Sequence, residues 1–339
     1  MSGERFALDE AALAAALEAH LPGFRGPLRA TKFEGGQSNP TYRLDAASGT
    51  YVLRRKPPGA LLASAHAVDR EYRVLTALQG RVPVARPLWL CHDDAVIGSM
   101  FYVMAFVDGR VEWDPSLPRH TPEQRSAHYH ALIDTLAAIH CVDLEATGLV
   151  DFGKPGNYFA RQIARWSEQY AQSRTRDIPA MDALIAELPA RCPADDGRVA
   201  LVHGDFRLDN LMWAKDGPQV LAVMDWELAT LGHPLADLGY LAMALRLPRN
   251  PALPGLAGLD RAAHGIPSEA ELLERYAART GQALPQDWGF VLAFSYFRLA
   301  AIAQGVARRA EQGNASNARA AEAGRMVDLL ASAGRAALG

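Results

Sequence analysis

The sequence HGDFRLDN occupies residues 203–210, and VMDWE follows at residues 223–227. Together they provide a carboxylate at Asp205, a carboxamide at Asn210 and a second carboxylate at Asp225. Phosphoryl transfer from a metal-bound nucleotide uses these groups: one carboxylate accepts a proton from the attacking hydroxyl, and an Asn and an Asp bind Mg²⁺. The residue types and their spacing therefore predict a phosphoryl-transfer site.

The composition is that of an ordinary globular protein with a sizeable core, since 49% of the residues are hydrophobic and 22% are charged. A net charge of −3 provides no overall basic field, so we expect no nucleic-acid partner. The three cysteines, Cys91, Cys141 and Cys192, are too few and too scattered for a disulfide framework or a zinc site. The N-terminus lacks the form of a signal peptide, and no run reaches the roughly 18 apolar residues of a membrane span. We expect a cytoplasmic location and no membrane partner.

The first third of the chain has the pattern of a small β-rich lobe, in which short strand-like runs are separated by Gly-containing turns. The expected strands span 28–33, 41–44, 51–54, 87–91 and 100–107, and the expected helices span 8–20 and 65–79. The composition becomes helix-like after residue 107. The predicted lobes are therefore residues 1–107 and 108–339.

The second lobe is predicted to be mostly helical. Thr121-Pro122-Glu123-Gln124 has the form of a helix start, in which Thr caps, Pro takes the first position and Gln bonds back to the cap. Further helices are expected at about 156–173, 179–189, 269–280, 286–310 and 317–337, with short strands at 199–202 and 220–224 and a loop at 248–267.

The stretch HGDFRLDN with the later DWE matches the His-x-Asp-x-x-x-x-Asn pattern of kinases. It resembles the aminoglycoside phosphotransferase-like branch of the kinase superfamily, where Gly replaces the usual Arg after His. The resemblance covers about residues 25–310 and implies an α+β, two-lobed, kinase-like fold. A small β-rich lobe with one main helix would bind the nucleotide, and a larger, mostly helical lobe would carry catalysis and substrate binding. ATP and Mg²⁺ are the implied cofactors.

Asp205 is the candidate catalytic base, because a carboxylate within hydrogen-bond reach can take the proton of the attacking hydroxyl. Asn210 and Asp225 are the candidate Mg²⁺ ligands, since Mg²⁺ takes oxygen ligands and completes its shell with water and phosphate. Taken alone, Asp205 is also compatible with a turn residue that caps a backbone group. The spacing to Asn210 and Asp225 favours the catalytic interpretation.

Three further residues receive supporting roles. The resemblance implies that Asp237 lies at a helix start and fixes the backbone of the catalytic loop. His203 would lie behind Asp205 as a structural group. Glu227 could contact a second metal ion through water.

The segment 34–39 is the candidate cover of the nucleotide phosphates, because Gly lets backbone N–H groups approach phosphate oxygens closely. A Gly-Gly turn in a hairpin is usually only a turn. However, GGQSNPTY resembles the Gly-x-Ser-Asn loop of this branch. The residues expected to contact the nucleotide here are Gly35, Gly36, Gln37, Ser38 and Asn39.

A cation on the third strand is expected to bind phosphates and to pair with a helix carboxylate. Strand alternation places Arg54 and Lys56 on one face and Arg55 on the other, and the Val-Leu-Arg step favours Arg54 over Lys56. Glu71 is the expected partner, with a solvated helix charge as the alternative. The run 101–107 resembles the hinge against which adenine would lie, with Met104, Ala105 and Phe106 near the base.

The acceptor is less determined than the donor. The motifs FEGGQSNPTYRL, YVLRRKPPG and HGDFRLDNLMW resemble the phosphotransferase domains found fused to, or beside, acyl-CoA dehydrogenases. This subgroup implies phosphorylation of a hydroxyacyl-CoA hydroxyl and a functional association with an acyl-CoA dehydrogenase. An excess of arginine in 291–339 favours an anionic substrate, although a solvated helix face would look the same. One alternative is a kinase whose acceptor is an aminoglycoside or a choline-like molecule. The other is a pseudokinase, which would bind nucleotide or a partner without turnover.

Overall fold

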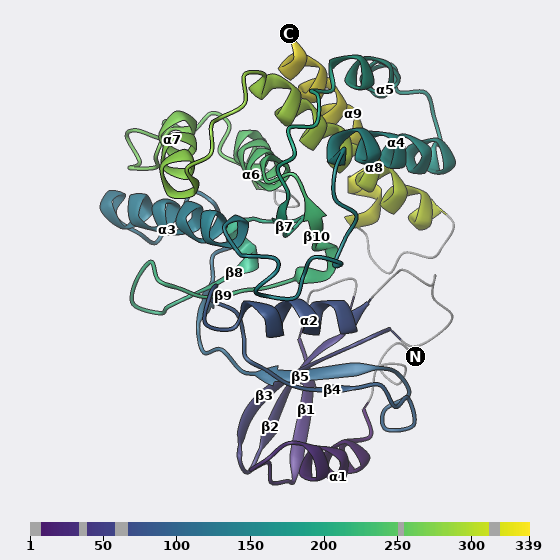
Figure 1. The fold of residues 1–339 in the computed structure, drawn as a ribbon, viewed down its shortest axis with the longest axis vertical. Coiled ribbons are helices and arrows are strands. Elements are labelled where there is room, and N and C mark those ends of the chain that lie inside the picture. Colours follow the sequence, from purple (N-terminus) through teal and green to yellow (C-terminus); the bar gives the residue numbers. More distant parts are fainter. Residues whose placement is uncertain (1–7, 34–38, 58–66, 250–253, 312–318) are drawn as a thin grey trace. The chain divides into compact units, whose positions relative to one another are not determined.

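The computed structural model describes residues 8–33, 39–57, 67–249, 254–311 and 319–339. It has the mixed α+β fold that the sequence predicts, with an antiparallel sheet near the N-terminus and a mostly helical remainder (Figure 1).

The chain packs as two compact units. The first contains Met1–Val111, Thr147–Leu149 and Asn210–Ala229, and the second contains the rest of the chain. The division into lobes 1–107 and 108–339 stays a prediction. The packing itself assigns the hairpin that carries Asn210 and Asp225 to the first unit.

The first unit is built on a five-stranded antiparallel sheet in the order β1-β2-β3-β5-β4. Its strands are β1 (Leu28–Lys32), β2 (Thr41–Ala46), β3 (Gly49–Arg55), β4 (Pro87–Cys91) and β5 (Phe101–Ala105). Each lies within two residues of the corresponding predicted strand, because short apolar runs bounded by Gly- and Pro-containing turns are readable as strands. The register pairs Arg54 of β3 with Tyr102 of β5.

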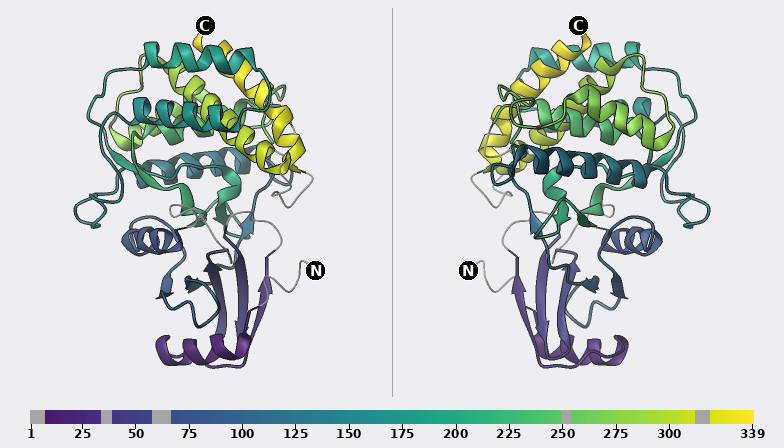
Figure 2. Two further views of the ribbon diagram at one scale, coloured as in Figure 1. Left: turned by 90° about the vertical axis from the view of Figure 1, so that its right-hand side faces the viewer. Right: turned by 90° about the vertical axis from the view of Figure 1, so that its left-hand side faces the viewer.

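Two helices pack against this sheet. Helix α1 (Glu10–His20) begins at Asp9, whose carboxylate accepts the N–H of Ala12, and it lies across the ends of β1, β2 and β3 (Figure 2). Helix α2 (Val68–Leu78) packs against β4 and β5. Apolar side chains from α1 and the strands form the core, among them Leu13, Leu17, Leu28, Leu44, Leu53, Phe101 and Val103.

A second small sheet belongs to the same unit. Strands β6 (Arg110–Val111), β8 (Leu211–Trp213) and β9 (Val220–Val223) pair in the order β6-β8-β9, and the short helix η3 (Trp226–Leu228) follows β9. The β8–β9 hairpin is what positions the two candidate metal ligands.

The second unit is mostly helical. Its described elements are α3 (Pro122–His140), α4 (Tyr158–Ser173), α5 (Pro179–Arg191), β7 (Ala200–Val202), β10 (Thr230–Gly232), α6 (Leu235–Arg246), α7 (Glu269–Thr280), α8 (Trp288–Glu311) and α9 (Arg319–Leu338). The short helix η2 (Leu208–Asn210) lies where the chain passes from the second unit to the first. Helix α8 contacts α4, α5, α6 and α9, which lie close together in Figure 1. The predicted capping box at α3 is confirmed, since Thr121 and Gln124 exchange hydrogen bonds of 3.3 and 3.0 Å.

Helix α6 is absent from the helices predicted by periodicity. All its residues from Leu235 to Leu245 are buried, so it has no polar face and therefore no amphipathic pattern to detect.

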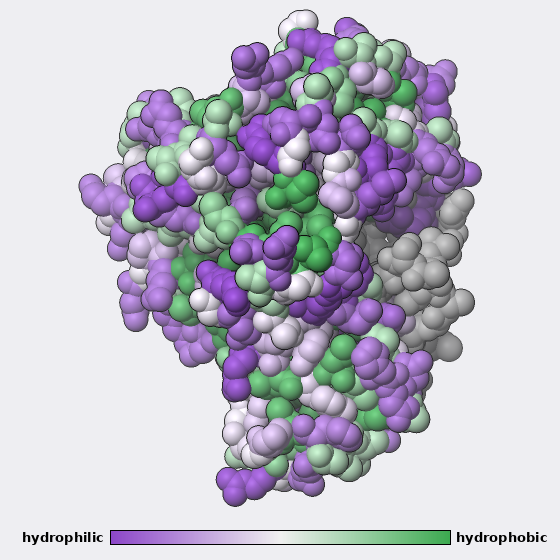
Figure 3. Space-filling view, viewed as in Figure 1, coloured by the Kyte–Doolittle hydropathy of each residue, from purple (hydrophilic) through white to green (hydrophobic). Residues whose placement is uncertain are grey.

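One helix among the described residues, within α8, is long and apolar enough to cross a membrane by length and composition. Because 78% of that stretch is buried among the other helices, it has the character of a core helix. The large exposed apolar side chains are scattered along the chain: Phe33, Trp113, Val150, Leu228, Leu284 and Leu329. Figure 3 shows small hydrophobic areas among hydrophilic residues on the face that it draws.

Candidate active site

In the second unit, a buried carboxylate holds the backbone of the HGDFRLDN loop. Asp237, on the first turn of α6, accepts the N–H of His203 at 2.6 Å and the N–H of Gly204 at 2.8 Å. His140 of α3 lies 3.3 Å from the same carboxylate and bonds Tyr276 at 2.7 Å. Burial opposes ionisation of Asp237, but the hydrogen bond from His140, the charges of the histidines and the Gly204 N–H hold its pKa below the ordinary value. The backbone of the loop is therefore fixed at the two residues that directly precede Asp205.

Asp205 itself is partly exposed. Its backbone N–H donates to Nδ1 of the fully buried His203 at 3.2 Å. The Nε of Arg207 lies 3.4 Å from its carboxylate. Tyr240 on α6 lies close enough to be affected by this carboxylate, since burial together with the charge on Asp205 raises the pKa of Tyr240 well above its ordinary value. Tyr240 thus stays a neutral phenol near Asp205.

In the first unit, the β8–β9 hairpin brings the two candidate metal ligands to one end of its ladder. Leu211 pairs with Val223, and the N–H of Met224 donates to the carbonyl of Asn210 at 2.8 Å. Asp225, the next residue, has φ 63° and ψ 59°, a left-handed conformation that is uncommon outside glycine. This backbone conformation ends the strand and turns the chain into η3.

The guanidinium of Arg54 lies at the centre of three carboxylates in the first unit. It is 2.8 Å from Glu71 of α2, 2.6 Å from Asp225 and 3.3 Å from Glu227. The contact with Glu71 is an ion pair in which the Nε–H is not directed at the oxygen, whereas Nη2 donates to the other two. Burial lowers the pKa of Arg54, but the carboxylates, with Glu71 foremost, raise it above its ordinary value. The third strand, the helix and the hairpin are joined through this one side chain.

Glu71 is almost fully buried and is held on two further sides. Asn39 donates from Nδ2 at 2.6 Å and the Tyr102 hydroxyl donates at 3.1 Å. Burial raises the pKa of Glu71, and Arg54 opposes that rise. Asn39 is the last residue of the candidate phosphate loop. Its other members, Gly35, Gly36, Gln37 and Ser38, lie outside the described residues.

The two cationic residues that follow Arg54 in the chain, Arg55 and Lys56, have different surroundings. Arg55 points to the opposite face, where it is buried and donates to Ser99 at 3.0 Å. Lys56 forms no ion pair with a residue that the structure describes. Arg54 is thus the cation of this strand that meets Glu71.

The expected hinge coincides with the end of β5 and the residues after it. Met104, Ala105 and Phe106 are all partly exposed. The N–H of Ala105 is already used, since it donates to the carbonyl of Arg86 at 2.8 Å. The ring of Phe106 packs under the guanidinium of Arg43 at 5.0 Å from its centroid. The Ala105 N–H is therefore not available to a base.

The residue types at the end of the β8–β9 hairpin suit a hard divalent cation. Asn210 and Asp225 offer carboxamide and carboxylate oxygens, the ligand type that Mg²⁺ prefers. Three carboxylates surround one guanidinium, so the cluster carries an excess of negative charge. The residues present therefore fit Mg²⁺.

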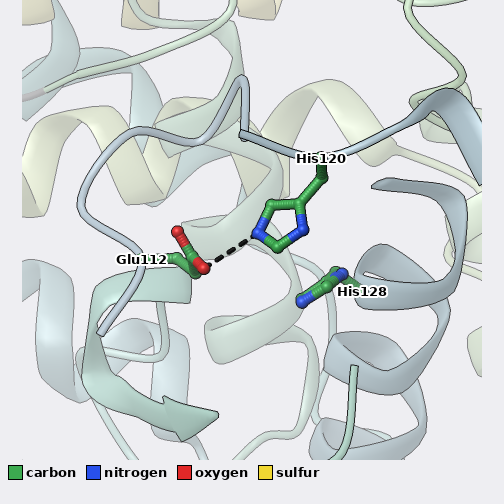
Figure 4. A group of neighbouring side chains, drawn as sticks. All are labelled: Glu112, His120 and His128. Atoms are coloured by element: carbon green, nitrogen blue, oxygen red, sulfur yellow. Dashed lines mark hydrogen bonds and ion pairs between the residues drawn. The ribbon is translucent and has the colours of Figure 1, made fainter. Parts of the chain in front are cut away.

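A second group of possible metal ligands lies in the second unit (Figure 4). Ligand atoms of Glu112, His120 and His128 lie within 4.8 Å of one another. Glu112 is already paired, with His120 at 2.9 Å and Arg119 at 3.3 Å. Both oxygens of Glu112 therefore already have a partner among the described residues.

Sequence reasoning did not find Tyr240 or Arg207 as neighbours of Asp205. Arg207 lies inside the HGDFRLDN stretch, two residues after Asp205, so the short separation in sequence could have indicated that the two are close. Tyr240 comes three residues after Asp237 on α6, and no local pattern connects it to Asp205. The first unit brings together Arg54, Glu71, Asp225 and Glu227, and the second brings together His203, Asp205 and Asp237.

Comparison with known proteins adds three findings. The model of the phosphotransferase enzyme family matches residues 29–294. The chain is 45% identical over 323 residues to acyl-CoA dehydrogenase family member 10 of Mus musculus, covering 93% of this chain and 30% of that protein. It is 43% identical over 321 residues to family member 11 of Rattus norvegicus, covering 91% of this chain and 40% of that protein. The chain thus spans well under half the length of these curated relatives.

Solved structures give the same result for the fold. A crystal structure from Ralstonia eutropha, provisionally described as an aminoglycoside phosphotransferase, is 48% identical with a TM-score of 0.90, covering 98% of both chains. A spectinomycin phosphotransferase in complex with ADP and spectinomycin is 12% identical with a TM-score of 0.62, covering 96% of this chain and 98% of that chain, which shows similarity of fold alone.

Proposed function

Because the chain belongs to the phosphotransferase enzyme family, we propose that it uses ATP and Mg²⁺ to phosphorylate a hydroxyl group of a hydroxyacyl-CoA. The resemblance read from the HGDFRLDN and DWE motifs is confirmed by the family match and by the 48% identical solved structure. The cofactors, the acceptor and the roles of individual residues are the proposal.

The observation that carries the proposal is the position of Arg54 between Glu71 and Asp225. A cation that is paired with a helix carboxylate and lies beside a metal-binding Asp is the arrangement that positions nucleotide phosphates in kinase-like sites. Asn210 and Asp225 would hold Mg²⁺. When bound, Mg²⁺ supplies positive charge next to the phosphate oxygens.

The chain's own groups account for the transfer. The acceptor oxygen forms a bond to the γ-phosphorus while the bond from that phosphorus to ADP breaks, and the acceptor proton goes to Asp205. Tyr240 and Arg207 orient the Asp205 carboxylate, and Asp237 fixes the loop that presents it. Catalysis on this proposal is mostly positioning and charge neutralisation.

The acceptor is inferred from the relatives and from charge. Two relatives at 43–45% identity are named acyl-CoA dehydrogenase family members, and a phosphorylated hydroxyl is a good leaving group for an acyl-CoA that is next to be dehydrated or isomerised. We propose an acyl-CoA dehydrogenase as functional partner and a cytoplasmic location. Arginines outnumber acidic residues in 291–339, which supports an anionic acceptor.

The test measures ADP release with ATP and Mg²⁺, together with the mass of the acceptor product. Hydroxyacyl-CoA thioesters of several chain lengths are compared with kanamycin-type aminoglycosides and with choline. We expect ADP release that depends on a hydroxyacyl-CoA and a product heavier by one phosphoryl group.

Two results would overturn this assignment. Turnover with aminoglycosides or choline but with no hydroxyacyl-CoA would assign the acceptor to another class. ATP binding without turnover on any acceptor would indicate a nucleotide-binding protein that is not an enzyme. The Asp205→Asn variant serves as the background control in each series.

A further inference from the structure

Arg298, in the middle of α8, is a buried cation without an acidic partner. Its exposed fraction is 6%, which places it among the buried residues of the second unit. Among the residues that the structure describes, no carboxylate lies within 4.0 Å of its guanidinium. Arginine is seldom buried without such a partner.

The neighbours of this guanidinium are aromatic. It lies 5.8 Å from the ring centroid of Trp166 on α4 and 5.7 Å from that of Tyr240 on α6. Trp166 is only partly buried, so its ring is in contact with solvent. Tyr240 also lies near Asp205, since burial and the charge of that carboxylate raise the pKa of the tyrosine. One ring thus separates Arg298 from the candidate base, and all four residues belong to the same unit.

The aromatic contacts leave the N–H groups of this guanidinium without an oxygen acceptor among the described residues. No nitrogen of Arg298 is among the fully buried atoms that lack a partner, so these N–H groups keep some contact with solvent. A carboxylate, a phosphate or a carbonyl oxygen is the acceptor that a guanidinium prefers. Arg298 therefore has donor capacity that a ligand oxygen can use.

We propose that Arg298, with Trp166 and Tyr240, forms a subsite for the acyl oxygen of the acceptor, next to the hydroxyl that Asp205 deprotonates. This inference rests on the proposed function and deepens it by naming the substrate feature that the protein recognises. The subsite takes the carbonyl oxygen of a thioester or the oxygens of a free carboxylate, while the two rings pack against the acyl chain.

The same charges disfavour a polycationic acceptor. Arg298, Arg207 and the nearby Arg165 place positive charge around Asp205 and Trp166. An ammonium group beside the reacting hydroxyl would be repelled, and repulsion of this kind separates related substrates.

The experiment compares ligands that differ by one carbonyl. Wild type, Arg298→Gln and Arg298→Lys are assayed with a hydroxyacyl-CoA, with its thioether analogue that lacks the carbonyl oxygen, and with the free hydroxy acid. Arg309→Gln, which changes an exposed arginine near the end of the same helix, is the matched control. Binding is measured by calorimetry in parallel with KM and kcat, and thermal melting reports folding.

We expect Arg298→Gln to raise the KM and Kd of the hydroxyacyl-CoA at least about tenfold, because a hydrogen bond to a charged group is lost. The KM for ATP and the Kd of the thioether analogue are expected to stay within about twofold of wild type. For Arg298→Lys we expect KM and Kd of the hydroxyacyl-CoA between those of wild type and Arg298→Gln, because lysine keeps the charge but lacks the paired N–H donors of a guanidinium. If Arg298→Gln loses as much affinity for the free hydroxy acid as for the thioester, the subsite also binds a carboxylate.

The proposed subsite would be overturned if Arg298→Gln weakened binding of the thioester and of the thioether equally, or weakened binding of neither. Carbonyl-dependent binding that needs Arg298 but gives no turnover in wild type would overturn the proposed function alone. Failure of wild type to bind either ligand would overturn both. If Arg298→Gln does not fold, the same comparison is decided by Arg298→Lys.

Discussion

The guanidinium of Arg54 and the carboxylate of Asp225 lie 2.6 Å apart although 171 residues separate them in the chain. This contact fastens the third strand to the hairpin that carries the candidate metal ligands. The carboxylate is partly exposed while the guanidinium is largely buried. The buried guanidinium therefore holds one oxygen of the Asp225 carboxylate in place.

Exchanging Arg54 for glutamine is expected to lower kcat/KM for ATP by about 100-fold or more, because a positioned cation on the phosphates is lost and three carboxylates remain. Lys56→Gln is the matched control and is expected to stay within about threefold of wild type. Steady-state ATP kinetics at saturating acceptor decide the matter. A larger loss for Lys56→Gln would transfer the role to that residue.

Asp205→Asn is expected to lower kcat by about 10²–10⁴-fold while the melting temperature stays close to that of wild type, because a partly exposed general base is removed without opening the core. Single-turnover kinetics and thermal melting measure the two quantities. Near-normal turnover in this variant would rule out Asp205 as the base.

Asp237→Asn is expected to lower the free energy of unfolding by about 3 kcal/mol, because the amide cannot accept both N–H bonds from His203 and Gly204 and leaves a buried donor unpaired. Urea denaturation measures the loss. Asp134→Asn, at a partly exposed ion cluster with Arg275 and Arg279, is the comparison and is expected to cost about 1 kcal/mol or less.

Stability at acid pH follows from the lowered pKa of Asp237. A carboxylate whose pKa is lower in the folded state stabilises the protein above its unfolded pKa of about 3.9. That contribution disappears as pH falls through the folded value. The difference in unfolding free energy between wild type and Asp237→Asn should therefore be constant from about pH 7 to 5 and shrink below about pH 4. A difference that grows on acidification would contradict this assignment.

Gly239→Ala is expected to lower stability by about 1–3 kcal/mol through overpacking. A Cβ at this position of α6 would lie 2.4 Å from Cγ1 of Val291 on α8. Gly305→Ala, inside α8 and with its nearest contact at 3.8 Å, is the control. It is expected to raise stability by about 0.5–1 kcal/mol through helix propensity. Denaturation midpoints of the two variants should move in opposite directions.

Much of the fold could be predicted because its elements have readable patterns. The strands β1 to β5 alternate or lie between Gly-rich turns, and helices such as α3 begin with a capping box. Helix α6 was not readable, since uniform burial removes the periodicity on which prediction depends. The assignment of the β8–β9 hairpin to the first unit was equally hidden, because it is a matter of long-range packing.

The sequence by itself determined which polar groups are present: HGDFRLDN and DWE place a carboxylate, a carboxamide and a second carboxylate at spacings that follow from the covalent chain. Only the tertiary structure decided which groups surround them. Arg54 rather than Lys56 meets Glu71, the N–H of Ala105 is already bonded, and Tyr240 links Asp205 to the unpaired Arg298. These relationships depend on how helices and strands distant in sequence pack together, and local residue patterns carry no information about such contacts.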